Sequence, residues 1–334
     1  MIDRRSALAA LAGLAAAACA SPPASDPVAA RPPPLRLDPL TDLVAAASLV
    51  WLVDVKPREV LAAPALAEPL EAAAPADRFE AFATRLGGVD LRQAEELVLA
   101  ADAGTTFGIA RLPVDPPLVE AAFARRAVSV EGRVQERRVT RLWGTVGQER
   151  QQIAIFGNEG AGMEVGAFGP LRTASYFAEG RLKRAAPALA AEPLASAAAR
   201  LGPAPLRGFA PGPFEGAWAR GLGGLLGAAT ALAAAARPTA LARPDSAAAL
   251  AVQVLLLGAW GADAPAAAQR LESAFRLLGE DPLGRLTGLD RPLDGPHARG
   301  DAGALVLDVA LDPGRLAGGV RALAGASLAE TLGL

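Results

Sequence analysis

Residues 128–143 read VSVEGRVQERRVTRLW, and the runs RQQIAIFG (150–157) and GMEVGAF (162–168) follow them. β-branched and aromatic residues recur in these runs, which is typical of strands. The segments between them, TVGQ (145–148) and GNEGAG (157–162), are short and contain glycine, as hairpin turns do. Strand-like runs joined by hairpins predict an antiparallel meander, and a meander combined with helices places the chain in the α+β class.

Outside this meander one local pattern recurs, in which a strand-like run meets a proline and an amphipathic helix follows. The prolines are Pro57, Pro116, Pro265 and Pro313, and an aspartate lies just before each of the last three. Aspartate accepts the free N–H groups of a first helical turn, and proline is preorganised for the first helical position. We therefore predict antiparallel sheets with helices packed on one face. The recurrence also favours two related halves that resemble the α/β plait, although a common helix-start signal would give the same pattern without duplication.

Changes in composition divide the chain into segments. They are a signal peptide (1–18), a cysteine with a Pro-rich tether (19–39), a first α+β half (40–184), an Ala/Pro-rich connection (185–213) and a second α+β half (214–334). The hydrophobic content of 52% lies well above that of disordered chains, so both halves can bury a core.

Two uncharged runs in the second half, 222–236 and 247–260, resemble membrane segments in composition. Each is shorter than the roughly 20 residues that a membrane-spanning helix needs, and we predict a pair of buried strands instead. Further on, residues 288–303 are rich in glycine and proline, and we expect a solvated loop there. This loop carries the only histidine, His297, beside Asp294 and Asp301. A histidine-dependent base would have to be this residue.

The first nineteen residues, MIDRRSALAALAGLAAAAC, predict export. Arg4 and Arg5 supply the positive start of a secretory signal, and residues 7–18 form its uncharged apolar core. The last four residues, AAAC, resemble the lipobox of bacterial lipoproteins, although that family usually has leucine where Ala16 stands. The resemblance implies cleavage before Cys19, a lipid on this cysteine, and a membrane anchor followed by an extended Pro-rich tether.

Two alternatives stay open for this segment. Cleavage after Ala18 or Ala20 also fits the small-residue rule for plain secretion, and cleavage after Ala20 would remove the cysteine. The run DRRSAL (3–8) resembles a twin-arginine signal without its usual phenylalanine, so either export route fits. In the lipoprotein class, the absence of aspartate directly after the cysteine implies sorting to the outer membrane, on its periplasmic or surface face. The resemblance covers the signal alone and implies no activity.

Composition also excludes several kinds of partner and cofactor. The net charge of −2 gives no general attraction to nucleic acid. One cysteine and one histidine exclude a histidine-rich zinc site, and a lipidated Cys19 would leave no thiol for a disulfide. We expect no cofactor. The adjacent acids Glu95 and Glu96 should point to opposite faces of a strand rather than form a catalytic pair.

Basic residues are the most distinctive polar feature of the meander. Arginines recur at odd positions along the first of its runs, so that a single face could meet anionic lipid headgroups or an acidic envelope protein. Charge that protects an exposed sheet edge would look the same. The candidate contact residues are Arg133, Arg137, Arg138 and Arg141.

These observations favour an exported, lipid-anchored envelope protein that acts as a non-enzymatic structural or interaction module. The alternative is a carrier of lipid or another apolar ligand, because a core rich in Ala, Leu and Val could line a cavity. An enzyme comes third, since no nucleophile, base or phosphate motif stands out.

Overall fold

The structure is a computed structural model, and it describes residues 35–182, 185–240 and 248–331, with the side chains of the last helix described as far as residue 322. The signal peptide, Cys19 and most of the predicted tether therefore lie outside the described residues. The end of that tether is already folded. Leu35 and Leu37 are 8% and 4% exposed and belong to the core, so the folded body begins before residue 40.

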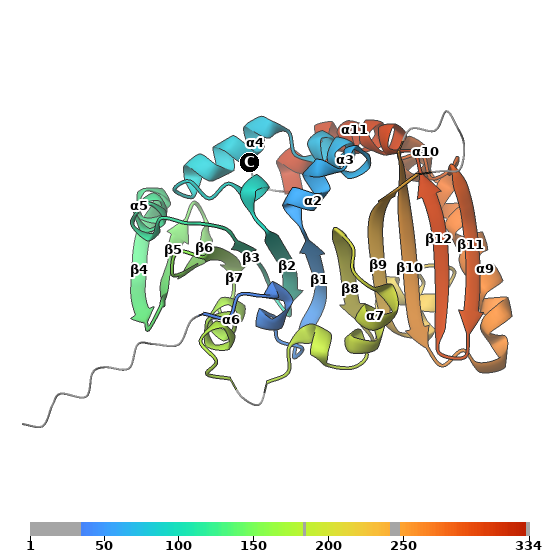
Figure 1. Ribbon diagram of the computed structural model, residues 1–334, viewed down its shortest axis with the longest axis horizontal. Coiled ribbons are helices and arrows are strands. Elements are labelled where there is room, and N and C mark those ends of the chain that lie inside the picture. Colours follow the sequence, from blue (N-terminus) through green and yellow to red (C-terminus); the bar gives the residue numbers. More distant parts are fainter. Residues whose placement is uncertain (1–34, 183–184, 241–247, 332–334) are drawn as a thin grey trace, which may run out of the picture. The chain divides into compact units, whose positions relative to one another are not determined.

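A single twelve-stranded antiparallel sheet forms the centre of the folded body, in the order β11-β12-β10-β9-β8-β1-β2-β3-β7-β6-β5-β4 (Figure 1). The α+β class and the antiparallel meander, which is β4 to β7, are confirmed. The strands are β1 (Leu49–Val55), β2 (Glu96–Asp102), β3 (Thr105–Arg111), β4 (Ala127–Glu136), β5 (Val139–Val146), β6 (Glu149–Phe156), β7 (Gly160–Gly166), β8 (Leu206–Pro211), β9 (Ala229–Thr239), β10 (Ala249–Gly258), β11 (Asp294–Asp301) and β12 (Ala304–Leu311).

Helices begin at the predicted joints. Pro57, Pro116 and Pro313 each open a helix, Pro265 stands in the first turn of another, and the Asp115 side chain accepts the N–H of Leu118 at 3.4 Å. The α-helices are α2 (Pro57–Ala62), α3 (Pro64–Ala73), α4 (Ala76–Arg85), α5 (Pro116–Arg126), α6 (Pro170–Ala178), α7 (Leu194–Leu201), α8 (Gly216–Ala219), α9 (Ala264–Glu280), α10 (Pro282–Leu286) and α11 (Pro313–Thr331). Short 3-10 turns are η1 (Leu40–Leu43), η2 (Leu91–Gln93), η3 (Ala188–Ala190), η4 (Leu225–Ala228) and η5 (Gly261–Asp263).

Helices cover both faces of the sheet, not the one face that we predicted. Leu52 of β1 packs in one cluster with residues of α6 and α7, whereas Val55 packs in another with residues of α2 and α9. Because side chains alternate along a strand, these two residues point to opposite faces. The physical reason is visible in β6, where residues 153–156 (IAIF) are all buried. A run that is apolar at every position needs a cover on both sides.

The two predicted halves share one connectivity. Each runs as a strand, helical turns, a hairpin of two strands, a helix, and then further strands that return to pair with the hairpin. Strands β1 and β8 join the halves in the middle of the sheet, with Leu52 opposite Phe209. The strand order differs from the plait, which splits its βαβ units, because β1 pairs directly with β2 and β8 with β9. The connection 185–213 contains α7 and the central strand β8.

Two predictions for the second half have different outcomes. The buried strands predicted near 222–236 and 247–260 are β9 and β10, and no helix among the described residues is long and apolar enough to cross a membrane. The expected loop at 288–303 is wrong, because it contains strand β11, which pairs with β12. β11 is an edge strand, and an edge tolerates Pro296, which has no N–H to donate. Its exposed, polar sequence lacks the alternation that marks inner strands.

Candidate functional site

A cavity of about 330 Å³ lies between α4, α5 and the sheet. Its floor comes from β2, β3, β6 and β7, and its roof from α4, α5 and the chain between α4 and β2. Thr106 is the one polar side chain among the described residues that line it. The walls include Phe82, Leu86, Leu97, Leu99, Val119 and Met163.

Strand register explains why these side chains share one face. Leu99 lies opposite Gly108, Gly108 opposite Met163, and Met163 opposite Ile153 across four neighbouring strands. Directly paired residues point to the same side of an antiparallel sheet. The Leu99 side chain lies over Gly108, since a Cβ at Gly108 would stand 2.9 Å from Cδ2 of Leu99. The apolar floor of the cavity therefore comes from one face of four paired strands.

Helix α4 covers this space without filling it. None of its ten residues, all of them described, is buried, although Phe82 faces the cavity. Helix α9 covers the same sheet face in the other half and is buried along its length, for example at Ala264, Leu271 and Phe275. A row of paired residues from Leu99 to Leu307 links the two regions. One half thus has a packed interior where the other has an apolar space.

The cavity is partly open to solvent. Leu99, on its wall, is 39% exposed, which is a large exposed fraction for a leucine in an inner strand. Pockets of this size with apolar walls are typical of sites that bind apolar ligands, and apolar cavities hold water poorly. The arrangement can accept a hydrocarbon chain and offers no group for acid–base chemistry.

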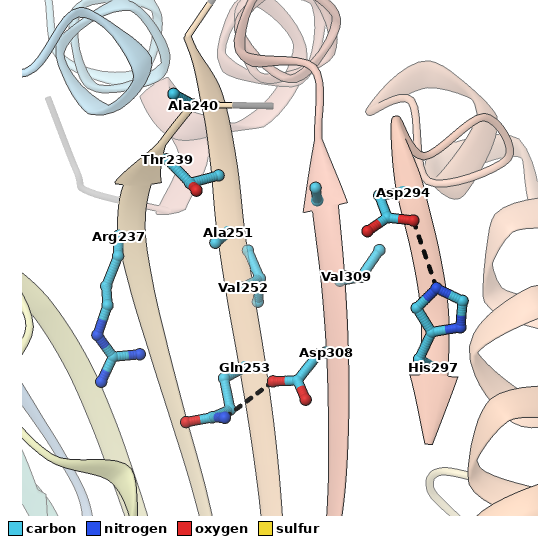
Figure 2. Close-up of a pocket in the computed structure, with 11 residues that line it drawn as sticks. Arg237, Thr239, Ala240, Ala251, Val252, Gln253, Asp294, His297, Asp308 and Val309 are labelled. Atoms are coloured by element: carbon cyan, nitrogen blue, oxygen red, sulfur yellow. Dashed lines mark hydrogen bonds and ion pairs between the residues drawn. The ribbon is translucent and has the colours of Figure 1, made fainter. Parts of the chain in front are cut away.

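A second, polar depression of about 400 Å³ lies on the opposite face, over β9 to β12. Figure 2 shows Gln253 and Asp308 across its middle, with Arg237 on the β9 side and Asp294 and His297 on the β11 side. His297, the histidine singled out above, therefore lies on a strand and lines a depression.

The ionisable groups of this depression are already engaged. Arg237 donates to the carbonyl oxygens of Leu201 and Pro203 at the end of α7. Asp308 accepts from Gln253 at 2.8 Å and from Arg299. His297 Nε2 lies 3.3 Å from Asp294 Oδ1, and both side chains are largely exposed (71% and 66%).

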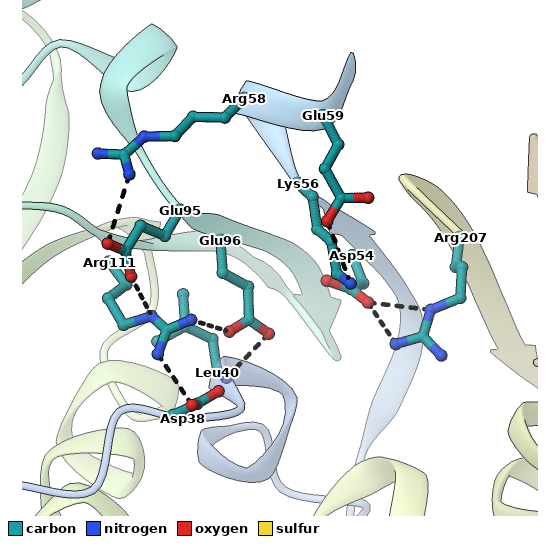
Figure 3. Close-up of polar contacts among 10 residues, drawn as sticks. All are labelled: Asp38, Leu40, Asp54, Lys56, Arg58, Glu59, Glu95, Glu96, Arg111 and Arg207. Atoms are coloured by element: carbon teal, nitrogen blue, oxygen red, sulfur yellow. Dashed lines mark hydrogen bonds and ion pairs between the residues drawn. The ribbon is translucent and has the colours of Figure 1, made fainter. Parts of the chain in front are cut away.

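A cluster of charged side chains ties the start of the folded body to the sheet (Figure 3). Arg111 lies within 3.2 Å of Asp38 and 3.6 Å of both Glu95 and Glu96. Glu96 is 6% exposed and accepts the N–H of Leu40 at 3.0 Å, and burial raises its pKa. Glu95 precedes β2 and is exposed, yet its carboxylate and that of Glu96 both contact the guanidinium of Arg111. We interpret this cluster as a structural contact and not as a substrate site, because its carboxylates already contact Arg111.

The structure does not bring the four candidate arginines onto one face. The strand predicted to continue past residue 136 instead turns at 137–138, so that β4 ends and β5 begins there. Arg133 pairs with Glu120 of α5 at 2.9 Å on one face, while Arg141, 8% exposed, lies 3.7 Å from Glu136. Arg138 pairs with Glu159, and Arg137 is exposed in the turn. β4 does lie at the sheet edge, as predicted.

Sequence reasoning missed the cavity, since its lining reads as ordinary core. Cys19 lies outside the described residues. Across the part of the chain that the structure describes, no three His, Cys, Asp or Glu side chains gather closely enough to hold a metal ion. No family model, curated protein or solved structure matches this chain.

Proposed function

We propose that this chain is an exported protein of the bacterial cell envelope, anchored by lipid on Cys19, that binds an apolar chain in the cavity under α4. The lipobox-like signal supports export and lipidation, and Ala20, the residue after the cysteine, supports sorting to the outer membrane. The cavity carries the binding proposal, because a space of about 330 Å³ with one polar side chain among its described lining residues suits hydrocarbon. This favours the carrier over the structural module as the primary role.

Burial of the chain supplies the affinity. Each methylene removed from water contributes about 0.8 kcal/mol, so a ligand of about ten carbons gains roughly 8 kcal/mol before the cost of ordering it. The half-open wall at Leu99 gives the ligand a way in, and α4 can shift outward at little cost because it buries no residue completely.

Filling the cavity tests the proposal. Ala161 lines the cavity and Ala234 lies on the same sheet face outside it, and both are half-buried alanines. We expect the purified protein to bind decanol at one saturable site, Ala161→Phe to lose this binding, and Ala234→Phe to keep it. Circular dichroism and thermal unfolding should show both variants folded. Equal binding by both variants, or no binding by the unaltered protein, would reject the cavity as the site.

An interaction module remains the second candidate, because the edge strand β4 is unusually apolar on its outside. Val128 and Val130 are 78% and 48% exposed, and an edge strand can add a strand from another chain. If this edge meets an envelope partner, lysine at Val128 and Val130 should abolish crosslinks to one defined protein in the envelope fraction. Crosslinks that persist in this variant would argue against the edge.

A further inference from the structure

Helix α5 carries an arginine on its buried side. Val119, Ala122 and Phe123 are 3%, 1% and 0% exposed, and Arg126 follows them at helical spacing. Val119 lines the cavity, and Arg126 lies on the same side of the helix about 10 Å further along its axis. Helical spacing thus places Arg126 beyond Val119, outside the residues that line the cavity.

Among the residues that the structure describes, the guanidinium of Arg126 has no ion-pair partner. Its Nε and Nη2 atoms are buried and find no hydrogen-bond partner among the residues that the structure describes. Burial lowers the pKa of Arg126, and the positive charge of Arg85 at the end of α4 lowers it further. Its Cζ lies 5.9 Å from the centroid of the Phe123 ring. Arg126 as a residue is half-buried, and burial of these two nitrogens without a counter-charge carries a cost that a bound anion would reduce.

A second unpartnered polar group borders the cavity. Oε1 of Gln151 is buried without a hydrogen bond in the described structure. Gln151 of β6 pairs with Val165 of β7, which lines the cavity. Two residues earlier on β6, Glu149 pairs with Val146 of β5. Val146 in turn pairs with Ala127, the residue after Arg126. The unpaired atom is an acceptor, so only the two N–H donors of this amide, and not Oε1, suit an anion.

Building on the proposed binding of an apolar chain, we propose that the natural ligand is a single-chain carboxylate, with its tail in the cavity and its head group on Arg126. A guanidinium and a carboxylate match in shape and form two parallel N–H to oxygen hydrogen bonds. An uncharged chain of equal length would fill the cavity but leave Arg126 unpaired.

Calorimetric titrations of decanoate and decanol at neutral pH test this assignment. We expect the purified protein to bind decanoate at least about tenfold more tightly than decanol, because a hydrogen bond to a charged group contributes that much affinity. Arg126→Met should remove this preference while decanol binding persists, which also shows that the variant is folded. Arg125→Met changes the exposed arginine next to it and should keep the preference.

The outcomes separate the two proposals. If Arg126→Met keeps the preference for decanoate, or the unaltered protein binds both ligands equally, the carboxylate assignment is wrong and the apolar site stands. If neither ligand binds the unaltered protein, the proposed function itself fails. Loss of the preference in Arg125→Met as well would assign the effect to general positive charge and overturn the role of Arg126.

Discussion

Asp54 of β1 and Arg207 of β8 form an ion pair where the two halves meet, with Arg207 Nε 3.0 Å from Asp54 Oδ2 (Figure 3). Asp54 is 2% exposed, and its strand lies beside β8 in the middle of the sheet. Both side chains project from the face that α6 and α7 cover. The pair therefore places a buried charge contact at the junction between the halves.

Removal of Arg207 alone should be costly, because it leaves a buried carboxylate without its counter-charge. We expect Arg207→Met to lower the free energy of unfolding by about 3 kcal/mol, and the double variant Asp54→Leu with Arg207→Met to recover most of that loss. Urea unfolding of the three proteins measures both values. A double variant as unstable as the single one would show that the contact is needed for more than charge balance.

The fold was predictable from sequence where local signals were strong, and the site was not. The meander was found because glycine turns separate its strands, and helix starts were found at Pro57, Pro116 and Pro313. Strand β11 was missed because Pro296 and its charged neighbours lie on an exposed edge. The cavity was missed because Leu97, Ala110 and Met163 read as core whether or not a helix packs on them. Arg126 could be identified from sequence, because it follows the buried residues of α5 at helical spacing.

Glu164 should make stability depend on pH. It is 0% exposed and accepts N–H bonds from Gly169 at 2.9 Å and Leu171 at 3.1 Å, but desolvation raises its pKa. A carboxyl with a raised folded pKa adds stability below its unfolded value of about 4.3, and this contribution is lost as the pH rises through the folded value. The unaltered protein should therefore lose stability relative to Glu164→Gln as the pH rises from about 4 to 8. Urea unfolding across this range measures the difference, and a constant difference would contradict the shift.

A charge on the cavity wall should abolish binding with little effect on the fold. Leu99 is 39% exposed, so Leu99→Glu should lower stability by less than about 1 kcal/mol while decanol affinity falls at least about tenfold. Leu277 of α9 is 64% exposed and lies outside the cavity, so Leu277→Glu is the control and should bind normally. Fluorescence competition with an apolar probe gives both affinities. Normal binding by Leu99→Glu would place the ligand elsewhere.

Filling the cavity should stabilise the empty protein as it removes binding. Ala161→Phe adds apolar contacts in a space that the native side chains leave open, and we expect a gain of about 1 kcal/mol. A gain in stability together with a loss of binding would indicate that the cavity is a binding site and not a packing defect. A loss of stability would mean that the cavity cannot hold the ring, and a leucine at the same position then becomes the test variant.

Lipidation of Cys19 can be tested independently of the cavity. Cells that express the full chain should incorporate a tagged fatty acid into the protein, and Cys19→Ala should lose the label. Label retained by that variant would show that the lipid is attached elsewhere or that the label reports bound ligand. Denaturing extraction before detection separates these two cases.

Native mass spectrometry of the full chain after mild extraction from the cell envelope tests the apolar site most directly. We predict a non-covalent adduct with the mass of one single-chain lipid on the unaltered protein and on Ala234→Phe, and its absence from Ala161→Phe. An unaltered protein without any adduct, or an adduct equally abundant on Ala161→Phe, would contradict the cavity as a ligand site.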